Sequence, residues 1–132
     1  NTRSMTRGTI DELPSSIVVR LLSNVGPGNQ GDDNGQTTAI GTLDTETGEE
    51  IWTYTSDSYS WASPVCFYDT EGNGYVIYVS CIGGRMYLLD GLTGELYDTF
   101  NFGVTTEASP VVYNNTIVIG TRNNEIYGIS LE

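Results

Sequence analysis

Residues 42–52 read Thr-Leu-Asp-Thr-Glu-Thr-Gly-Glu-Glu-Ile-Trp, and this stretch decides the fold. An aspartate that opens a turn accepts backbone N–H hydrogen bonds from residues two or three positions on, and glycine supplies the positive φ that closes a hairpin. We therefore predict that Asp44 ends one strand, that Thr47 and Gly48 form the turn, and that the next strand carries Trp52. A tryptophan at that position can pack its ring on a neighbouring sheet.

The same pattern recurs 46 residues further along the chain. A Leu-Asp-Gly-Leu-Thr-Gly-Glu segment places Asp90, Thr93 and Gly94 in the same roles. An Ala-Ser-Pro-Val segment also occurs twice with this offset, at residues 62–65 and 108–111. Two independent motifs that share one offset indicate an internal repeat.

Each copy of the repeat predicts four short strands. In the middle copy the runs rich in Val, Ile, Tyr and Thr fall at 64–68, 75–80, 85–89 and 95–102, and turns rich in glycine separate them. Residues 75–79 are apolar without alternation, which indicates a strand buried on both faces. A period in the forties with four strands per copy is typical of propeller blades. We therefore expect an all-β chain.

The repeat predicts how the chain is divided. We expect an N-terminal flank (1–14), a first blade (15–60) whose opening strand starts at 15–18 and which carries a loop insertion (24–36), a second blade (61–106) and a third, incomplete blade (107–132). These are slightly under three four-stranded antiparallel blades. Closed propellers usually need about 4–8 blades. We therefore expect the chain to be a C-terminal portion of a larger propeller, or to assemble with other copies.

The stretch 42–52 resembles the tryptophan-docking motif of PQQ-like (pyrroloquinoline-quinone-type) repeat β-propellers, which reads Ala-x-Asp-x-x-x-Gly-Lys-x-x-Trp. Asp44, Gly48 and Trp52 match that motif in spacing, whereas the second copy has Asp98 in place of the tryptophan. The family contains quinoprotein dehydrogenases, which bind PQQ with calcium, and cofactor-free members, of which some are BamB-like protein-binding scaffolds and others are secreted or lipid-anchored. Quinoprotein sites typically use adjacent cysteines, a catalytic aspartate and basic residues, whereas here Cys66 and Cys81 are not adjacent, there is no lysine and no aspartate matches a catalytic motif, so we expect the cofactor-free branch. The resemblance implies an extracytoplasmic location: secreted, periplasmic or anchored at the cell surface.

Charge and composition exclude several function classes. The 132 residues contain 17 Asp and Glu against 5 basic residues, all of them arginine, and no histidine, which gives a net charge of −12. Within these residues there is no histidine base, histidine-ligated metal or lysine Schiff base. Nucleic-acid binding needs clustered Lys and Arg, and a membrane span needs about 18 apolar residues. We therefore expect no nucleic-acid partner, no membrane insertion and no catalysis. The alternative is a fragment of a PQQ- and calcium-dependent oxidoreductase.

Two aromatic residues are the candidate binding residues. Tyr59 and Trp61 lie in and directly after the polar stretch 55–60, which should form an exposed connection between blades, where functional residues concentrate. They predict a surface that binds a protein, or a glycan. Tyrosines inside the strands, such as Tyr75, are interpreted as packing between blades.

Two aspartates and two cysteines are weaker candidates for metal binding or catalysis, and each pair has a competing structural interpretation. Asp32 and Asp33 lie in the insertion and could offer oxygen ligands to calcium, but they lack the spaced carboxylate pattern of a calcium loop, so a surface insertion is the competing interpretation. Cys66 and Cys81 lie in apolar segments, where they are interpreted as free thiols, with a disulfide and a metal or catalytic role as the alternatives.

Overall fold

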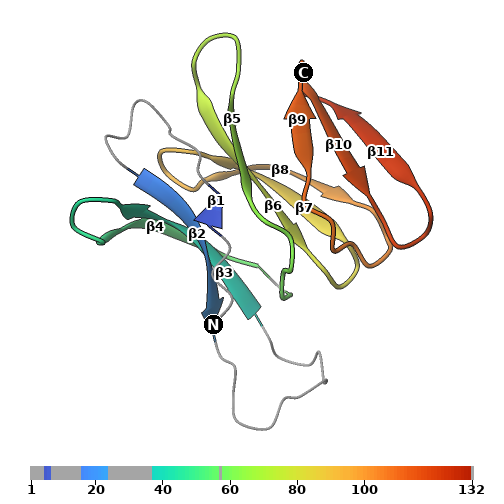
Figure 1. Ribbon diagram of the computed structural model, residues 1–132, viewed down its shortest axis with the longest axis horizontal. Helices are drawn as coiled ribbons and strands as arrows, with labels where there is room; N and C mark the ends of the chain where they lie inside the picture. The colour runs from blue at the N-terminus through green and yellow to red at the C-terminus, as the bar shows by residue number, and fades with distance from the viewer. Residues whose placement is uncertain (1–4, 7–15, 24–36, 57, 132) are drawn as a thin grey trace, which may run out of the picture.

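The computed structural model of the chain describes residues 5–6, 16–23, 37–56 and 58–131, with side chains from residue 40 onward. These residues form three antiparallel sheets in which neighbouring strands follow one another along the chain (Figure 1). The first sheet contains β1 (Met5–Thr6), β2 (Ser16–Ser23), β3 (Thr37–Asp44) and β4 (Glu50–Thr55). The second contains β5 (Val65–Tyr68), β6 (Gly74–Ser80), β7 (Arg85–Asp90) and β8 (Leu96–Asn101). The third contains β9 (Val111–Tyr113), β10 (Thr116–Gly120) and β11 (Ile126–Ser130).

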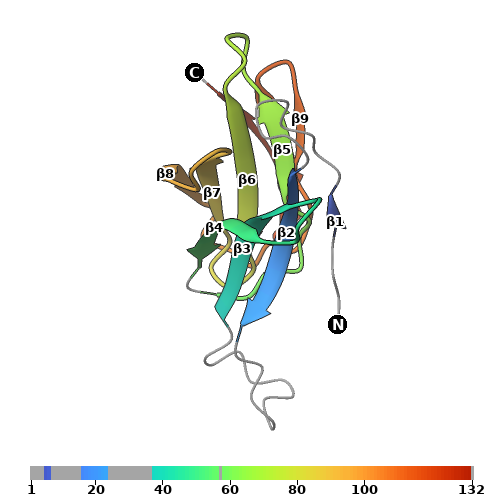
Figure 2. The same ribbon diagram turned by 90° about the vertical axis from the view of Figure 1, so that its left-hand side faces the viewer.

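The three sheets pack face to face in chain order, with the second sheet between the other two. In Figure 1 they fan out from the blue and teal first sheet to the orange and red third sheet, and Figure 2 views the row with the first sheet in front. Each hairpin of the second sheet lies within two residues of its predicted position. The predicted all-β architecture is therefore confirmed, as is the incomplete third copy, which contributes three strands among the described residues.

The first sheet differs from the expectation at its beginning. We predicted a flank at 1–14 and an opening strand that starts at 15–18. Instead, the short strand β1 lies inside that flank and pairs with β2, where Met5 is opposite Val19. The strand β2 is thus the second strand of its sheet, and the insertion at 24–36 lies between the second and third strands. A two-residue strand carries no periodic pattern, so the sequence offered no signal for it.

One apolar core lies between the first and second sheets. Its buried residues come from β3 and β4 on one side and from β6 and β7 on the other, and they are Ile40, Trp52, Val76, Tyr78, Tyr87 and Leu89. Tyr54 and Cys66 pack against this cluster. The rings of Tyr54 and Tyr87 lie 5.6 Å apart across the interface. Face-to-face burial of two sheets is what removes this apolar surface from water.

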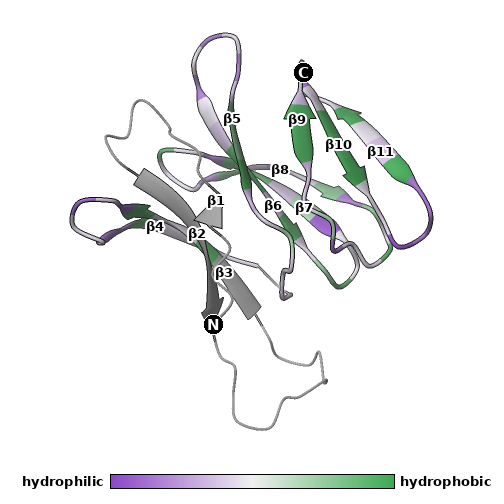
Figure 3. Cartoon of the chain, viewed as in Figure 1, coloured by the Kyte–Doolittle hydropathy of each residue, from purple (hydrophilic) through white to green (hydrophobic). Residues whose placement is uncertain are grey.

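A second core lies between the second and third sheets. It contains Ala62, Ile77, Val79, Met86, Phe102, Ile117 and Ile119. The strand β6 therefore sends Val76 and Tyr78 into one core and Ile77 and Val79 into the other. This alternation confirms that the unbroken apolar run is a strand buried on both faces. Figure 3 shows β6 and β10 largely in the hydrophobic colour, whereas the turns are hydrophilic.

The backbone repeats as well as the sequence. In the first sheet the register between β3 and β4 shifts between Thr42 and Leu43, and in the second sheet the register between β7 and β8 shifts between Leu88 and Leu89. These irregularities are 46 positions apart. Immediately before the shift along β3 and β7, Thr42 is opposite Trp52 and Leu88 is opposite Asp98. Trp52 and Asp98 are therefore structurally equivalent positions.

Cys66 lies in β5, and Cys81 directly follows β6. Cys66 and Cys81 are free thiols, as predicted, and burial raises the pKa of Cys66 to about 11. None of the residues that the structure describes forms a helix with the length and apolar character that crossing a membrane requires.

Candidate functional site

The Asp-x-x-Thr-Gly segments form turns with the predicted geometry. The Oδ1 atom of Asp44 accepts the backbone N–H groups of Glu46 at 2.8 Å and Thr47 at 2.9 Å. Gly48 has a φ of 75° and donates its N–H to the carbonyl oxygen of Asp44. The hydrogen bond from the Thr47 amide is the largest of the effects that lower the pKa of Asp44. These contacts orient the hairpin that carries Trp52.

The second copy repeats this turn and adds one contact. Asp90 Oδ1 accepts the N–H groups of Leu92 and Thr93, each at 2.8 Å, and Gly94 has a φ of 73°. In addition, the Tyr97 hydroxyl donates to Asp90 Oδ2 at 2.6 Å. Chiefly because of this hydrogen bond to Asp90, the pKa of Tyr97 rises to about 12. Partial burial acts to raise the pKa of Asp90. Hydrogen bonds from Tyr97 and the turn amides act in the opposite direction and together outweigh burial, so the pKa of Asp90 is lowered.

The indole of Trp52 joins the first sheet to the second. Its Nε1–H donates to the carbonyl oxygen of Gly91 at 3.0 Å, and both residues are buried. The ring also lies against Gly94, because a Cβ atom built there would be 2.5 Å from Cε3 of the indole. The tryptophan of the first copy thus docks on the glycine turn of the second.

The connection between the first two sheets presents Trp61 to solvent. The ring of Trp61 is 61% exposed, as expected for a binding candidate, and its centroid lies 5.4 Å from that of Tyr59. Tyr59 itself is only 9% exposed, so the expectation of an exposed side chain there is wrong. Its carbonyl oxygen accepts the N–H of Cys81, which holds the residue against the second sheet.

Buried hydrogen bonds fix this connection. The hydroxyl of Ser56 lies 3.1 Å from that of Tyr78, and Ser58 Oγ accepts the N–H of Ile82 at 3.2 Å. The N–H of Trp61 donates to Cys81 Sγ at 3.3 Å. The serines that suggested a solvated loop therefore satisfy the interior polar groups of the connection, and they hold Trp61 in one place.

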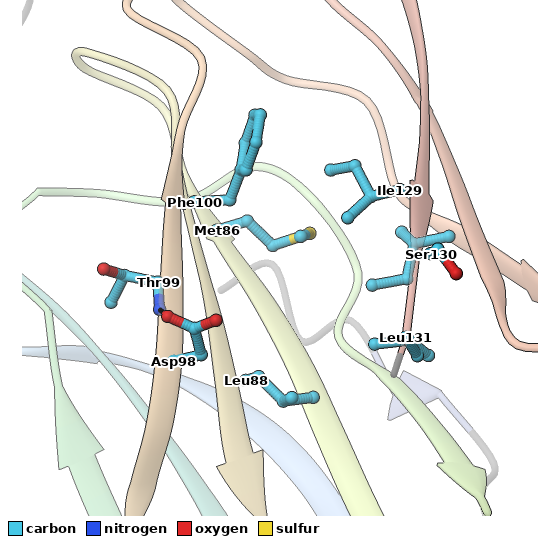
Figure 4. Close-up of a pocket in the computed structure, with 9 residues that line it drawn as sticks. Met86, Leu88, Asp98, Thr99, Phe100, Ile129, Ser130 and Leu131 are labelled. Atoms are coloured by element: carbon cyan, nitrogen blue, oxygen red, sulfur yellow. Dashed lines mark hydrogen bonds between the residues drawn. The ribbon is translucent and has the colours of Figure 1, made fainter.

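A groove that sequence reasoning missed runs between the second and third sheets. Figure 4 shows its apolar end, where Met86 and Phe100 face Ile129 across the gap. A wider end, with a cavity volume of about 640 Å³, is lined by Tyr75 and Tyr97, among others. The strand tyrosine Tyr75 was interpreted as packing alone. Asp98, at the position equivalent to Trp52, lines both ends of the groove.

The metal candidates remain predictions. Asp32 and Asp33 lie outside the described residues. Across the ranges with described side chains, no three His, Cys, Asp or Glu residues are grouped as a metal site would require.

Three face-stacked antiparallel sheets, each a meander and each related to the next by the repeat, define a portion of a β-propeller. The solved structure of BamB from Moraxella catarrhalis has this fold, with a TM-score of 0.59 at 19% sequence identity. The match covers 88% of this chain and 30% of the BamB chain. The resemblance to PQQ-like β-propellers is thereby confirmed at the level of the fold.

Curated sequence relatives match a shorter part of the chain than BamB does. No family model matches the chain. It is 26% identical over 81 residues to the human beta-alanine-activating enzyme and 27% identical over 81 residues to the mouse enzyme. Each match covers 61% of this chain but 7% of the enzyme, so the chain spans a small fraction of either relative.

Proposed function

We propose that the chain is a non-catalytic part of a β-propeller that presents the connections between its blades to a protein partner outside the cytoplasm. Each sheet then forms one blade, and the first blade includes β1. A closed ring of the BamB type contains further blades, since this chain matches 30% of that structure. The extracytoplasmic location rests on the resemblance to BamB and to the PQQ-like repeat.

The single observation that carries this function is the state of Trp61. Trp61 is 61% exposed on a connection between two sheets, and tryptophan is enriched among the residues that dominate binding energy at protein interfaces. Because the backbone at Trp61 is held by Cys81 and the connection is held by Ser56 and Ser58, binding a partner there orders little further backbone.

Site-specific photo-crosslinking tests this function. A benzophenone amino acid placed at position 61 of the full chain, exposed to an extract of the cells that make the protein, should give one dominant adduct. The matched control places the same group at Tyr113, which is 74% exposed on β9. The Trp61→Ser variant should fail to retain the protein found in the adduct. Equal adducts from positions 61 and 113 would contradict the proposal.

Two further outcomes separate the alternatives. Retention of soluble oligosaccharides by the wild type, lost in Trp61→Ser, would replace a protein partner with a glycan. A bound-quinone absorption band after addition of PQQ and calcium would support the oxidoreductase alternative. The activity that names the beta-alanine-activating enzymes is not carried over to this chain, because the matched segment is 7% of those proteins.

A further inference from the structure

The loops at one end of the sheets form a hydrogen-bonded row. In the turn after β6, the N–H of Cys81 donates to the carbonyl oxygen of Tyr59 at 2.8 Å, and the carbonyl oxygen of Cys81 accepts the N–H of Thr106 at 3.2 Å. In the turn after β10, the N–H of Arg122 donates to the carbonyl oxygen of Thr105 at 3.3 Å. The row therefore runs from the connection before β5, through the turn after β6 and the connection after β8, to the turn after β10.

The exposed side chains of this row differ between the repeat copies. Trp61 and Glu107 are equivalent, because each directly precedes a copy of the Ala-Ser-Pro-Val segment. Ile82 and Arg122 are equivalent, because each is the second residue after its strand, β6 or β10. The first two loops of the row thus expose two apolar residues, Trp61 at 61% and Ile82 at 44%, whereas the next two carry an ion pair between Glu107 and Arg122.

The ion pair leaves one edge of the guanidinium available. The Nε–H and Nη2–H groups of Arg122 both donate to Glu107 Oε2, at 3.0 Å and 2.7 Å. A guanidinium has five N–H donors in a planar fork, so the donors along the edge between Nη1 and Nη2 can still bind a carboxylate through two parallel hydrogen bonds. The side chain of Arg122 is 63% exposed. Glu107 therefore orients the guanidinium without using all of its donors.

The exposure of these side chains follows from their places in the turns. Ile82 is 44% exposed although a connection lies on each side of its turn, at Tyr59 and at Thr106. Arg122 has the equivalent place in its own turn, and its side chain pairs with the connection before it, at Glu107. By this equivalence, a connection on the other side of the turn leaves the guanidinium exposed.

The two ends of the sheets carry different charges among the described side chains. The turns at the end opposite the row, with the strand residues that flank them, hold no basic residue and eight carboxylates: Asp44, Glu46, Glu49, Glu50, Asp69, Glu71, Asp90 and Glu95. The loops of the row hold both arginines whose side chains are described, Arg85 and Arg122, with Glu107 and Glu125. An acidic partner is therefore repelled by the opposite end more than by the row.

We propose that the partner protein that covers Trp61 also places an acidic side chain on Arg122. The proposal rests on the function proposed above and adds the chemistry of the partner: an extended segment with an apolar residue at Trp61 and Ile82 and a carboxylate at Arg122. Hydrogen bonds through Cys81 and Thr105–Thr106 link these two places, and backbone steps of about 5 Å put them about 15–20 Å apart. An extended segment covers that distance in about five residues.

Nuclear magnetic resonance with defined peptides tests this chemistry. The probe is the acetylated and amidated peptide Leu-Ser-Thr-Ser-Thr-Glu, added to the full chain at about 20 mM salt, where exposed charges are weakly screened. We expect saturable shifts of the Trp61 indole N–H and the Arg122 Nε–H signals. The same peptide with glutamine in place of glutamate should bind about fivefold more weakly, because it lacks the charge-assisted contact. Equal affinities for the two peptides, or saturable shifts from neither, would overturn the proposal.

Matched variants separate Arg122 from the general charge of the chain. Arg122→Gln should lower the affinity for the glutamate peptide to that of the glutamine peptide, and Arg122→Lys should restore only part of it, because an ammonium lacks the planar fork. Glu46→Gln changes the charge in the turn after β3, at the opposite end, and should leave the affinity unchanged. Equal affinity of the wild type and Arg122→Gln, or an equal effect of Glu46→Gln, would refute the contact.

Crosslinking at position 61 separates this proposal from the function on which it rests. If the adduct forms and Arg122→Gln yields as much of it as the wild type, the partner is retained and the carboxylate contact is wrong. If no dominant adduct forms while the two peptides are still distinguished through Arg122, the proposed function alone is contradicted.

Discussion

The indole ring of Trp52 occupies the space that a side chain on Gly94 would need. An ideal Cβ on Gly94 would lie 2.5 Å from Cε3 and 2.6 Å from Cδ2 of the indole. The glycine therefore serves two purposes, because its φ of 73° closes the turn and its missing side chain admits the ring. Gly48, the equivalent residue of the first copy, has a φ of 75° but no atom within 4 Å of its would-be Cβ.

This pair of glycines makes a controlled comparison. Gly48→Ala should destabilise the chain by about 1–2 kcal/mol, the cost of an L-residue in the left-handed region. Gly94→Ala should cost that amount plus about 1–3 kcal/mol, because the new methyl group overlaps the indole. Urea denaturation of both variants measures the difference. Equal costs would show that Trp52 does not press on Gly94 in solution.

Trp52 should stabilise the interface through both its ring and its N–H. Trp52→Ala should destabilise the chain by about 3–5 kcal/mol, as expected for a deleted buried aromatic. Trp52→Phe should cost less, about 1–3 kcal/mol, because the ring is retained while the buried carbonyl of Gly91 loses its donor. The chain has two tryptophans, the buried Trp52 and the exposed Trp61. Folded Trp52→Phe therefore keeps only the exposed indole and should show red-shifted tryptophan fluorescence, whereas folded Trp61→Phe keeps only the buried indole and should emit at shorter wavelength. Identical emission spectra would contradict this assignment.

The turns could be predicted because their interactions are local. Asp44 reaches Glu46 and Thr47, and Gly48 acts through its own φ, so residue type and spacing define the geometry without any tertiary information. The repeat also predicts the strands on either side of each turn, because a motif found twice at one offset places its flanking segments at the same offset. The register shifts in the first and second sheets occur at equivalent positions, so the two copies share strand pairing as well as turns.

Other features depend on partners far away in the sequence. The polar stretch before Tyr59 suggested exposure, but Ser56 is satisfied by Tyr78 and Ser58 by Ile82, and neither partner is signalled locally. The strand β1 is defined by pairing with β2 and not by its own residues. Asp98 and Leu131 line the same cavity although they lie in different sheets, and the sequence repeat does not predict that proximity.

Two turn aspartates should make stability depend on acidity. The amide of Thr47 is the leading cause that lowers the pKa of Asp44, and the side chain of Asn73 is the leading cause for Asp69, from an ordinary value of 3.8 in both. A carboxyl whose pKa is lower in the folded state contributes stability that is complete above the unfolded value and is lost as the pH falls through the folded value. The urea midpoint should thus be level from about pH 5 to 7 and fall below about pH 4.

The acid dependence should be traceable to these residues. Asp44→Asn and Asp69→Asn should each flatten the decrease in the urea midpoint between about pH 5 and pH 2, because the amide does not titrate there. Asp98→Asn serves as the control, since it removes a carboxylate that is outside these turns. A decrease that is unchanged in both turn variants would assign the acid sensitivity to other groups.

Tyr97 should titrate late because its phenol donates to Asp90. Its pKa is raised to about 12, chiefly by that 2.6 Å hydrogen bond. For a group whose folded pKa is raised, the stabilisation is present below the unfolded value, about 10, and is lost as the pH rises through about 12. The phenolate absorbance of wild type minus Tyr97→Phe should therefore rise with a midpoint near 12. In Asp90→Asn the same difference should move toward 10, because the carboxylate that holds the proton is gone. A midpoint near 10 in the chain with Asp90 intact would show that this hydrogen bond does not persist in solution.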